Sequence, residues 1–224
     1  MNEFTFLYHT VLPALLRGTG VTLELIAISI PLGILIGVLS AIGRVYGHKV
    51  IQGLCIFHQI IFRGIPLLVQ LFMLFYGLAA WGIRLSPFTC AITAFGLCSG
   101  AYHAEYIRGA ILSIPESQMM AARSLGISKW RAIKSIILPQ ALRKAIPPCS
   151  NEIIYLIKYS SLAYMVTVTE LMSEAQVLAS RYFKSLEIFL LAGLIYWMLV
   201  YIATKFIDMV ENKTKIPGFG MEGT

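Results

Sequence analysis

Residues 114–147, IPESQMMAARSLGISKWRAIKSIILPQALRKAIP, form a basic, helix-forming stretch in an otherwise apolar chain. Pro115 suits the first turn of a helix, where a missing N–H costs nothing, and Glu116 places negative charge at the positive end of the helix dipole. A helix is therefore predicted from Glu116 to Leu125. Gly126 can adopt the left-handed conformation that closes a helix at its C-terminus.

A second short helix is predicted beyond this glycine. Ser128 is a suitable N-cap, and Pro139 should stop or kink the helix after Leu138 because proline lacks the backbone donor. Three isoleucines are expected to pack against neighbouring helices: Ile133, Ile136 and Ile137. The stretch thus predicts two short helices joined at a glycine elbow, in which Ala121 and Ala122 leave little side-chain bulk.

The composition around this stretch is that of a membrane protein. Hydrophobic residues make up 58% of the 224 residues, charged residues 13%, and the mean hydropathy is +0.76, whereas soluble domains are about half apolar and a quarter charged. The net charge of +7 is spread between apolar runs rather than gathered with aromatic residues, so no nucleic-acid partner is expected. We expect an all-α integral membrane protein.

Five apolar stretches approach the ~20 residues that a helix needs to cross a bilayer. Spans are predicted at about 21–42, 51–80, 88–107, 146–168 and 186–207. Pro31 and Gly33 interrupt the first, and Gly64 and Pro66 should break the second. Residues 1–17 are apolar but cut short by Pro13, which predicts a helix lying on the membrane surface. The whole chain, 1–224, is predicted to be one membrane domain with a loop at 114–145 between the third and fourth spans.

The basic residues predict the orientation of the chain. With the N-terminus outside, twelve lysines and arginines fall in cytoplasmic pieces and four in external pieces. The positive-inside rule therefore predicts an external N-terminus, a cytoplasmic C-terminus and a cytoplasmic elbow.

The elbow resembles the cytoplasmic "EAA" loop of binding-protein-dependent ABC importer permeases. The resemblance rests on residues at fixed offsets: Ala121, Ala122, Gly126, Ile136, Leu138 and Pro139. It implies a coupling helix that docks in a cleft of the ATPase subunit. Met120 stands where the family has its leading glutamate, which implies a more apolar contact at that point.

A second resemblance covers residues 62–72, FRGIPLLVQLF, which are similar to the FRGTPLLVQLF segment of polar amino-acid ABC permeases, with Ile65 in place of threonine. Residues 101–110, 150–152 and 158–163 resemble further segments of that subfamily. The resemblance implies a type I ABC importer permease of the inner membrane that carries a polar amino acid.

Polar residues inside the predicted spans are the candidates for the substrate path, because charge there is costly and should face protein or a water-filled path. The candidates are Arg63, Gln70, Glu105, Asn151, Glu152 and Lys158. Arg63 could present its guanidinium to a carboxylate or pin the broken helix. Glu105 could pair with Arg108 one turn on. Glu152 could contact substrate or hold the elbow, and Lys158 has no partner within its own helix.

No catalytic or metal-binding constellation is visible. His9, His48, His58 and His103 lack metal-ligand spacing, the four cysteines form no C-x-x-C, and no phosphate-binding G-x-x-x-x-G-K-[ST] motif occurs. We therefore expect no enzyme activity, no metal and no cofactor, with ATP bound by a partner subunit.

The resemblance also implies partners: two ATP-binding cassette subunits, an extracytoplasmic solute-binding protein, and a like or homologous second permease subunit, all around a lipid-embedded chain. The carboxylates at Glu105 and Glu152 favour a cationic amino acid, with glutamine or glutamate as alternatives. A secondary transporter would show inverted repeats and more spans. A structural membrane subunit of another complex is the remaining alternative.

Overall fold

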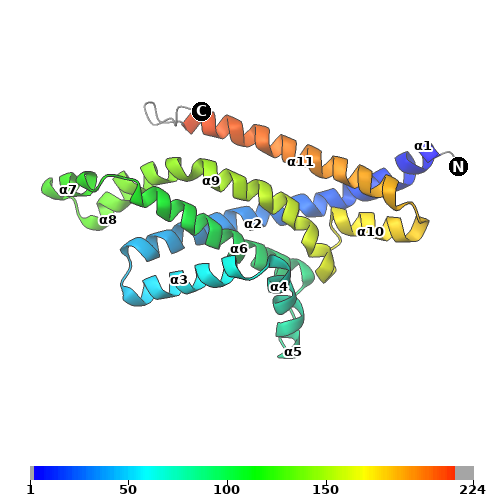
Figure 1. The fold of residues 1–224 in the computed structure, drawn as a ribbon, viewed down its shortest axis with the longest axis horizontal. Coiled ribbons are helices and arrows are strands. Elements are labelled where there is room, and N and C mark those ends of the chain that lie inside the picture. Colours follow the sequence, from blue (N-terminus) through cyan, green and yellow to red (C-terminus); the bar gives the residue numbers. More distant parts are fainter. Residues whose placement is uncertain (1–2, 215–224) are drawn as a thin grey trace.

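The computed structural model describes residues 3–214, and within them every regular element is helical, as predicted (Figure 1). The α-helices are α1 (Glu3–Phe6), α2 (Leu12–Tyr46), α3 (Lys49–Gly64), α4 (Leu67–Phe72), α5 (Leu78–Ala80), α6 (Pro87–Leu112), α7 (Glu116–Ser124), α8 (Lys129–Ala132), α9 (Leu138–Tyr159), α10 (Leu171–Tyr182) and α11 (Ser185–Thr214). Between them lie π-helical turns at Leu7–Val11, Met73–Gly77 and Ile133–Ile137, and a 3-10 helix at Ser160–Val166.

Helix α6 is the centre of the molecule, because α2, α3 and α9 all pack against it. Glycines let α2 approach α6 closely: a Cβ on Gly37 would lie 2.4 Å from Cβ of His103, and one on Gly33 would lie 2.7 Å from Oγ of Ser99. Small residues allow such close backbone approach between membrane helices. Pro31 does not break α2, so the predicted interruption of the first span is absent.

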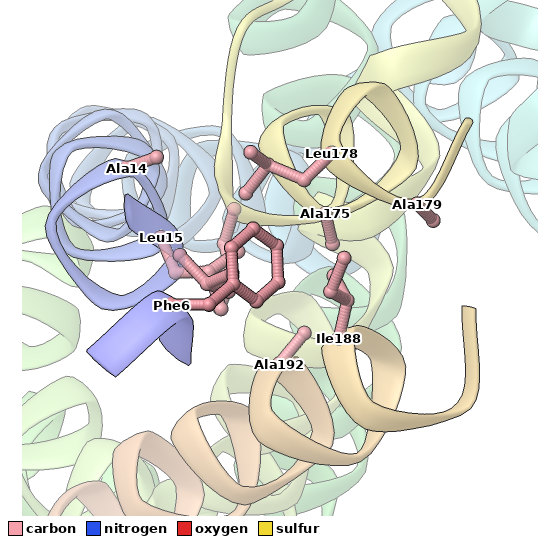
Figure 2. Packing of buried hydrophobic residues seen from close by; sticks show 10 residues of the cluster. Phe6, Ala14, Leu15, Ala175, Leu178, Ala179, Ile188 and Ala192 are labelled. Carbon is pink, nitrogen blue, oxygen red and sulfur yellow. The ribbon is translucent and has the colours of Figure 1, made fainter. Parts of the chain in front are cut away.

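The expected helix end at Pro13 is absent, because one helical run continues from Leu7 to Tyr46. The position of residues 1–17 on the membrane surface stays a prediction. The π-helical turn at Leu7–Val11 places Pro13 in the first turn of α2, where no donor is needed. Phe6 is buried in a cluster with α10 and α11, including Leu178, Ile188 and Ala192 (Figure 2). Met1 and Asn2, part of the same prediction, lie outside the described residues.

The predicted break in the second span is confirmed. Helix α3 ends at Gly64, and the chain beyond Pro66 turns by 107° into α4. In Figure 1, α4 and α5 therefore point away from the long axis along which α3 lies.

The count of five spans stays a prediction. By length and composition, two described helical runs could cross a membrane, Leu7–Tyr46 and Ser185–Thr214, and a third could if the bent pair Lys49–Gly64 and Leu67–Ala80 is one span. The stretches predicted at 88–107 and 146–168 lie in α6, and in α9 with the following 3-10 helix, and neither helix passes this test. Both carry charged side chains, including Glu105 and Glu152, which lower their apolarity.

Candidate functional site

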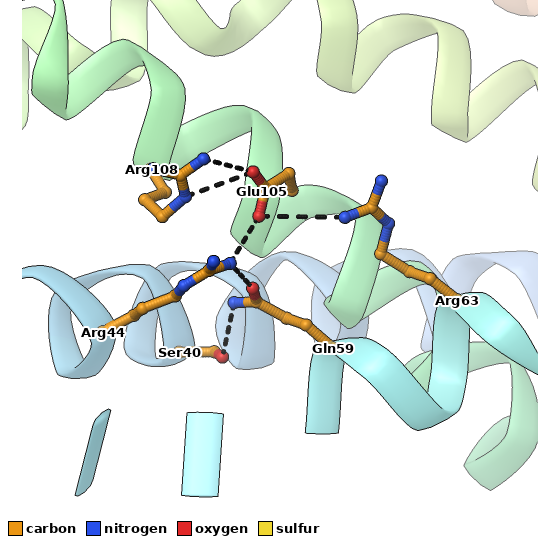
Figure 3. Close-up of polar contacts among 6 residues, drawn as sticks. All are labelled: Ser40, Arg44, Gln59, Arg63, Glu105 and Arg108. Atoms are coloured by element: carbon orange, nitrogen blue, oxygen red, sulfur yellow. Dashed lines mark hydrogen bonds and ion pairs between the residues drawn. The ribbon is translucent and has the colours of Figure 1, made fainter. Parts of the chain in front are cut away.

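One carboxylate binds several arginines where α2, α3 and α6 meet (Figure 3). Glu105 accepts hydrogen bonds from Nη1 of Arg44 at 2.6 Å and from Nε of Arg108 at 3.2 Å, and it also pairs with Nη2 of Arg108. The predicted Glu105–Arg108 pair is thus confirmed. The nearest nitrogen of Arg63 is farther away, at 3.8 Å. The charge of Arg63 is therefore the least neutralised of the three.

Arg44 extends the cluster toward α3. Its guanidinium donates to the amide oxygen of Gln59, and the amide nitrogen of Gln59 donates to Oγ of Ser40 at 3.3 Å. These bonds fasten the end of α2 to α3. Only Gly47 and His48 separate the two helices, so α2 and α3 lie side by side and run in opposite directions.

Arg63 reaches from this cluster toward an aromatic side chain of α6. Its guanidinium carbon lies 5.3 Å from the ring centroid of Tyr102, within the range of a cation–π contact. The side chain of Arg63 is 39% exposed, against 24% for Glu105. Arg63 is held in place by a ring and a distant carboxylate while its donors stay accessible.

Gln70 stabilises the broken helix from the inside. It is buried, and its Nε2 donates to the backbone oxygens of Phe62 at 3.0 Å and Ile65 at 2.7 Å. These carbonyls lie at the end of α3, where the chain turns and helix partners are missing. The amide nitrogen of Gln70 is thus accounted for by the helix break, whereas its buried Oε1 has no hydrogen-bond partner among the described residues.

Glu152 is a second carboxylate, and its surroundings differ from those of Glu105. It is 5% exposed on α9, and no hydrogen bond or ion pair joins it to another described residue. Helix α9 packs against α6, the helix that carries Tyr102. The adjacent Asn151 is exposed.

Lys158 lies apart from the other candidates. It is exposed near the end of α9, with Nζ 4.5 Å from the ring centroid of Tyr155. Tyr155 in turn stacks on Tyr159, with 6.0 Å between ring centroids. The structure brings Arg63 close to Glu105, with 3.8 Å between the nearest nitrogen and oxygen. Neither Glu152 nor Lys158 forms a hydrogen bond or ion pair with these two residues among the described residues.

The elbow forms at the predicted glycine. Helix α7 begins at Glu116, and Gly126 has a φ of +77°. The N–H of Ile127 bonds to the carbonyl of Ala122 at 3.0 Å, and the N–H of Gly126 to that of Arg123 at 3.0 Å. This pair of bonds is the Schellman motif, which closes a helix on a left-handed residue. Ala122 is buried and Ala121 is exposed.

The second elbow helix does not end where predicted. A π-helical turn at Ile133–Ile137 follows α8, and Pro139 lies in the first turn of α9, which runs on to Tyr159. A proline there gives up no needed hydrogen bond. Ile133 and Ile137 are buried, as predicted, and Ile136 and Leu138 are half-buried. The stretch predicted as the fourth span, 146–168, starts inside α9 and continues through the 3-10 helix at Ser160–Val166. Its bounds in the membrane stay a prediction.

A pair of amides that no sequence pattern indicated fastens the elbow to α9. Gln118 on α7 and Gln140 on α9 bond to each other through both amide groups, at 3.1 and 2.6 Å. No spacing rule joins residues that far apart in sequence. This pair holds α7 against the first turn of α9.

A buried glutamate was missed as well. Glu170 accepts from the backbone N–H groups of Met172 and Ser173 at the start of α10, at 2.9 and 2.8 Å, and from the hydroxyl of Tyr196 at 2.7 Å. Thr22 on α2 bonds it at 3.4 Å. Glu170 directly precedes the helix α10, and this position in the sequence could have identified it as an N-cap. Among the described residues, no cluster of metal-binding side chains occurs.

Residues 29–216 match the family described as "Binding-protein-dependent transport system inner membrane component". The chain belongs to this family. It is a permease subunit of an ATP-binding cassette importer, and the family consists of transport components rather than enzymes. The predicted family, all-α permease fold and absence of enzyme activity are therefore confirmed.

Named relatives of this permease agree with that assignment. The probable amino-acid ABC transporter permease protein PatM of Vibrio harveyi is 40% identical over 214 residues, and YckA of Bacillus subtilis, with the same description, is 37% identical over 216; each alignment covers 94% of this chain and 96% of the relative. A crystal structure of an amino acid ABC transporter with histidines superimposes with a TM-score of 0.85 at 28% identity, covering 95% of this chain and 99% of that one.

Proposed function

We propose that this permease forms, with a second permease subunit, the path by which a polar amino acid is imported. Five spans would cross the membrane with the N-terminus outside and the elbow in the cytoplasm. The observation that carries the coupling half of this proposal is the elbow: a Schellman-closed glycine turn whose outer surface exposes Met120, Leu125 and Trp130. Leu125 is 81% exposed. An apolar surface on a short, well-held helix pair suits docking into a partner's cleft.

An ATPase subunit is the partner that this elbow would engage. Closure of two such subunits on ATP would move the elbows of the permease pair together. Because the amide pair of Gln118 and Gln140 fastens α7 to α9, movement of the elbow would be carried into α9 and its Glu152. A solute-binding protein would deliver substrate on the external side, and hydrolysis would reset the path.

The substrate would meet Arg63 and Glu152. The donors of Arg63 are accessible and incompletely neutralised, so they suit the α-carboxylate of an amino acid. Glu152 has no described partner and suits a cationic group, whether the α-amino group or a basic side chain. Glu105 already pairs with Arg44 and Arg108. Glu152 is therefore the one of these two carboxylates that would favour a substrate with a basic side chain.

The test of coupling is Gly126→Val in the full transporter, with Gly126→Asn as the matched control. No atom lies within 4 Å of a Cβ placed at Gly126, so any defect arises from the backbone and not from a clash. Valine resists a φ of +77°, whereas asparagine tolerates it. We expect Gly126→Val to lose uptake and binding-protein-stimulated ATP hydrolysis while membrane insertion persists, and Gly126→Asn to keep both.

Near-normal uptake in Gly126→Val would contradict the coupling role of the elbow. Failure of the intact chain to co-purify with any ATPase subunit would contradict the proposed docking of the elbow.

A further inference from the structure

An apolar groove of about 710 Å³ runs between α2, α9 and α11, away from Arg63 and Glu152. Its walls are aliphatic and aromatic side chains except at His103, Cys149, Ser150 and Arg143. Ser150 donates to the backbone oxygen of Ile146, and Nδ1 of His103 is bonded to Ser99, whereas the buried Nε2 of His103 has no hydrogen-bond partner among the described residues. The groove is partly open at the protein surface, and neither Arg63 nor Glu152 of the proposed substrate path lines it.

The length of the groove matches one leaflet of a bilayer. Along α11 it extends from Leu199 to Val210, and along α2 from Leu23 to Ile34. At 1.5 Å per residue, eleven steps give about 16 Å on each helix, roughly half of the ~30 Å hydrocarbon core. An apolar chain that entered from the membrane surface would reach the middle of the bilayer.

A positive charge marks one end of the groove. Arg143 is the one lysine or arginine among the described lining residues, it is exposed, and it forms no ion pair with another described residue. It lies near the start of α9. In Figure 1 the start of α9 is on the same side of the molecule as the end of α11. At the end of α11, Asp208, Glu211 and Lys213 together carry a net charge of −1, and at the start of α9 Arg143 and Lys144 carry +2. This end of the groove therefore keeps a net positive charge.

We propose that this groove binds one membrane phospholipid, with an acyl chain between α2, α9 and α11 and the phosphate on Arg143. A guanidinium is the side chain best suited to a phosphate.

The first test measures phospholipid retained by the assembled transporter after extraction from vesicles of phosphatidylethanolamine and phosphatidylglycerol. Ala203→Trp fills the groove, since Ala203 lines it; Tyr201→Trp, on an exposed side chain outside the lining, is the matched control. We expect Ala203→Trp to retain about one phospholipid less per chain than wild type, and Tyr201→Trp to retain the wild-type amount. Equal retention in the two variants would overturn the proposal.

The second test removes the charge at the mouth. Arg143→Gln should release the retained phospholipid roughly tenfold faster, because it loses a charge-assisted hydrogen bond. Lys205→Gln, at a basic residue of α11 outside the lining, should not. An unchanged release rate in Arg143→Gln would refute the phosphate contact.

A photoreactive phenylalanine analogue at Phe206, another lining residue, identifies the occupant directly. Cross-linking to phospholipid supports the proposal, and cross-linking to a second permease subunit overturns it. None of these measurements depends on transport, so their failure would leave the proposed function standing.

Discussion

Glu105 and Glu152 are carboxylates on neighbouring helices, α6 and α9, in the predicted membrane region, and their surroundings are opposite. Glu105 is bound by Arg44 and Arg108, with Arg63 at 3.8 Å, although 24% of its side chain is exposed. Glu152 is 5% exposed and has no described partner. The ion pairs of Glu105 explain its presence by a structural role. A buried charge without a partner is costly, so Glu152 is the better candidate for a functional role.

The largest effect on stability is expected at Glu105. Glu105→Gln leaves Arg44 and Arg108 without their anion, at a cost on the order of 3 kcal/mol, the low end for breaking a buried pair because Glu105 is partly exposed. The yield of assembled transporter and its thermal midpoint should both fall. Glu116→Gln, at an exposed glutamate of α7, is the control and should change neither. A stable Glu105→Gln variant would remove the contrast between the two carboxylates.

Arg63 tests the difference between Glu105 and Glu152, because it lies beside the Glu105 cluster and its exposed donors are also proposed to bind substrate. Arg63→Gln should lower uptake roughly tenfold or more, the value of a charge-assisted hydrogen bond in a partly dry site, with little change in thermal midpoint. Arg63→Lys keeps the charge and should retain part of the uptake. If Arg63→Gln destabilises the protein as much as Glu105→Gln does, Arg63 is part of the structural cluster instead.

The smallest effect is expected at Lys158. Its ammonium group is exposed and contacts the ring of Tyr155, and exposed charges contribute little. Lys158→Gln should lower uptake about two- to threefold, measured in the same vesicles as wild type. A loss of uptake as large as that of Arg63→Gln would place Lys158 in the substrate path, which would then extend toward the end of α9.

Local rules predicted the elbow and the broken helix well. Gly126 permits the left-handed turn, and Pro66 after Gly64 removes a helix donor and fixes φ, so the effects of these residues could be predicted from the sequence. Prolines were harder: Pro13 and Pro139 each follow a π-helical turn that places them where no donor is required. The apparent helix ends at these prolines were therefore not real.

The arrangement of charges could be predicted only in part. Glu105 and Arg108 are three residues apart on one helix, so their pair followed from helix geometry. Arg44 reaches Glu105 from another helix, and its place depends on how α2 packs against α6. No sequence rule distinguishes the occupied Glu105 from the unoccupied Glu152, because the distinction arises from tertiary contacts.

The most direct test of this account is Glu152→Gln, reconstituted with its ATPase and solute-binding protein, with uptake and stimulated ATP hydrolysis measured in the same vesicles. If Glu152 contacts the passing amino acid, the variant should assemble normally, keep stimulated hydrolysis near the wild-type level and lose at least about tenfold in uptake. Unchanged uptake, or a parallel loss of uptake, hydrolysis and assembly, would contradict the account.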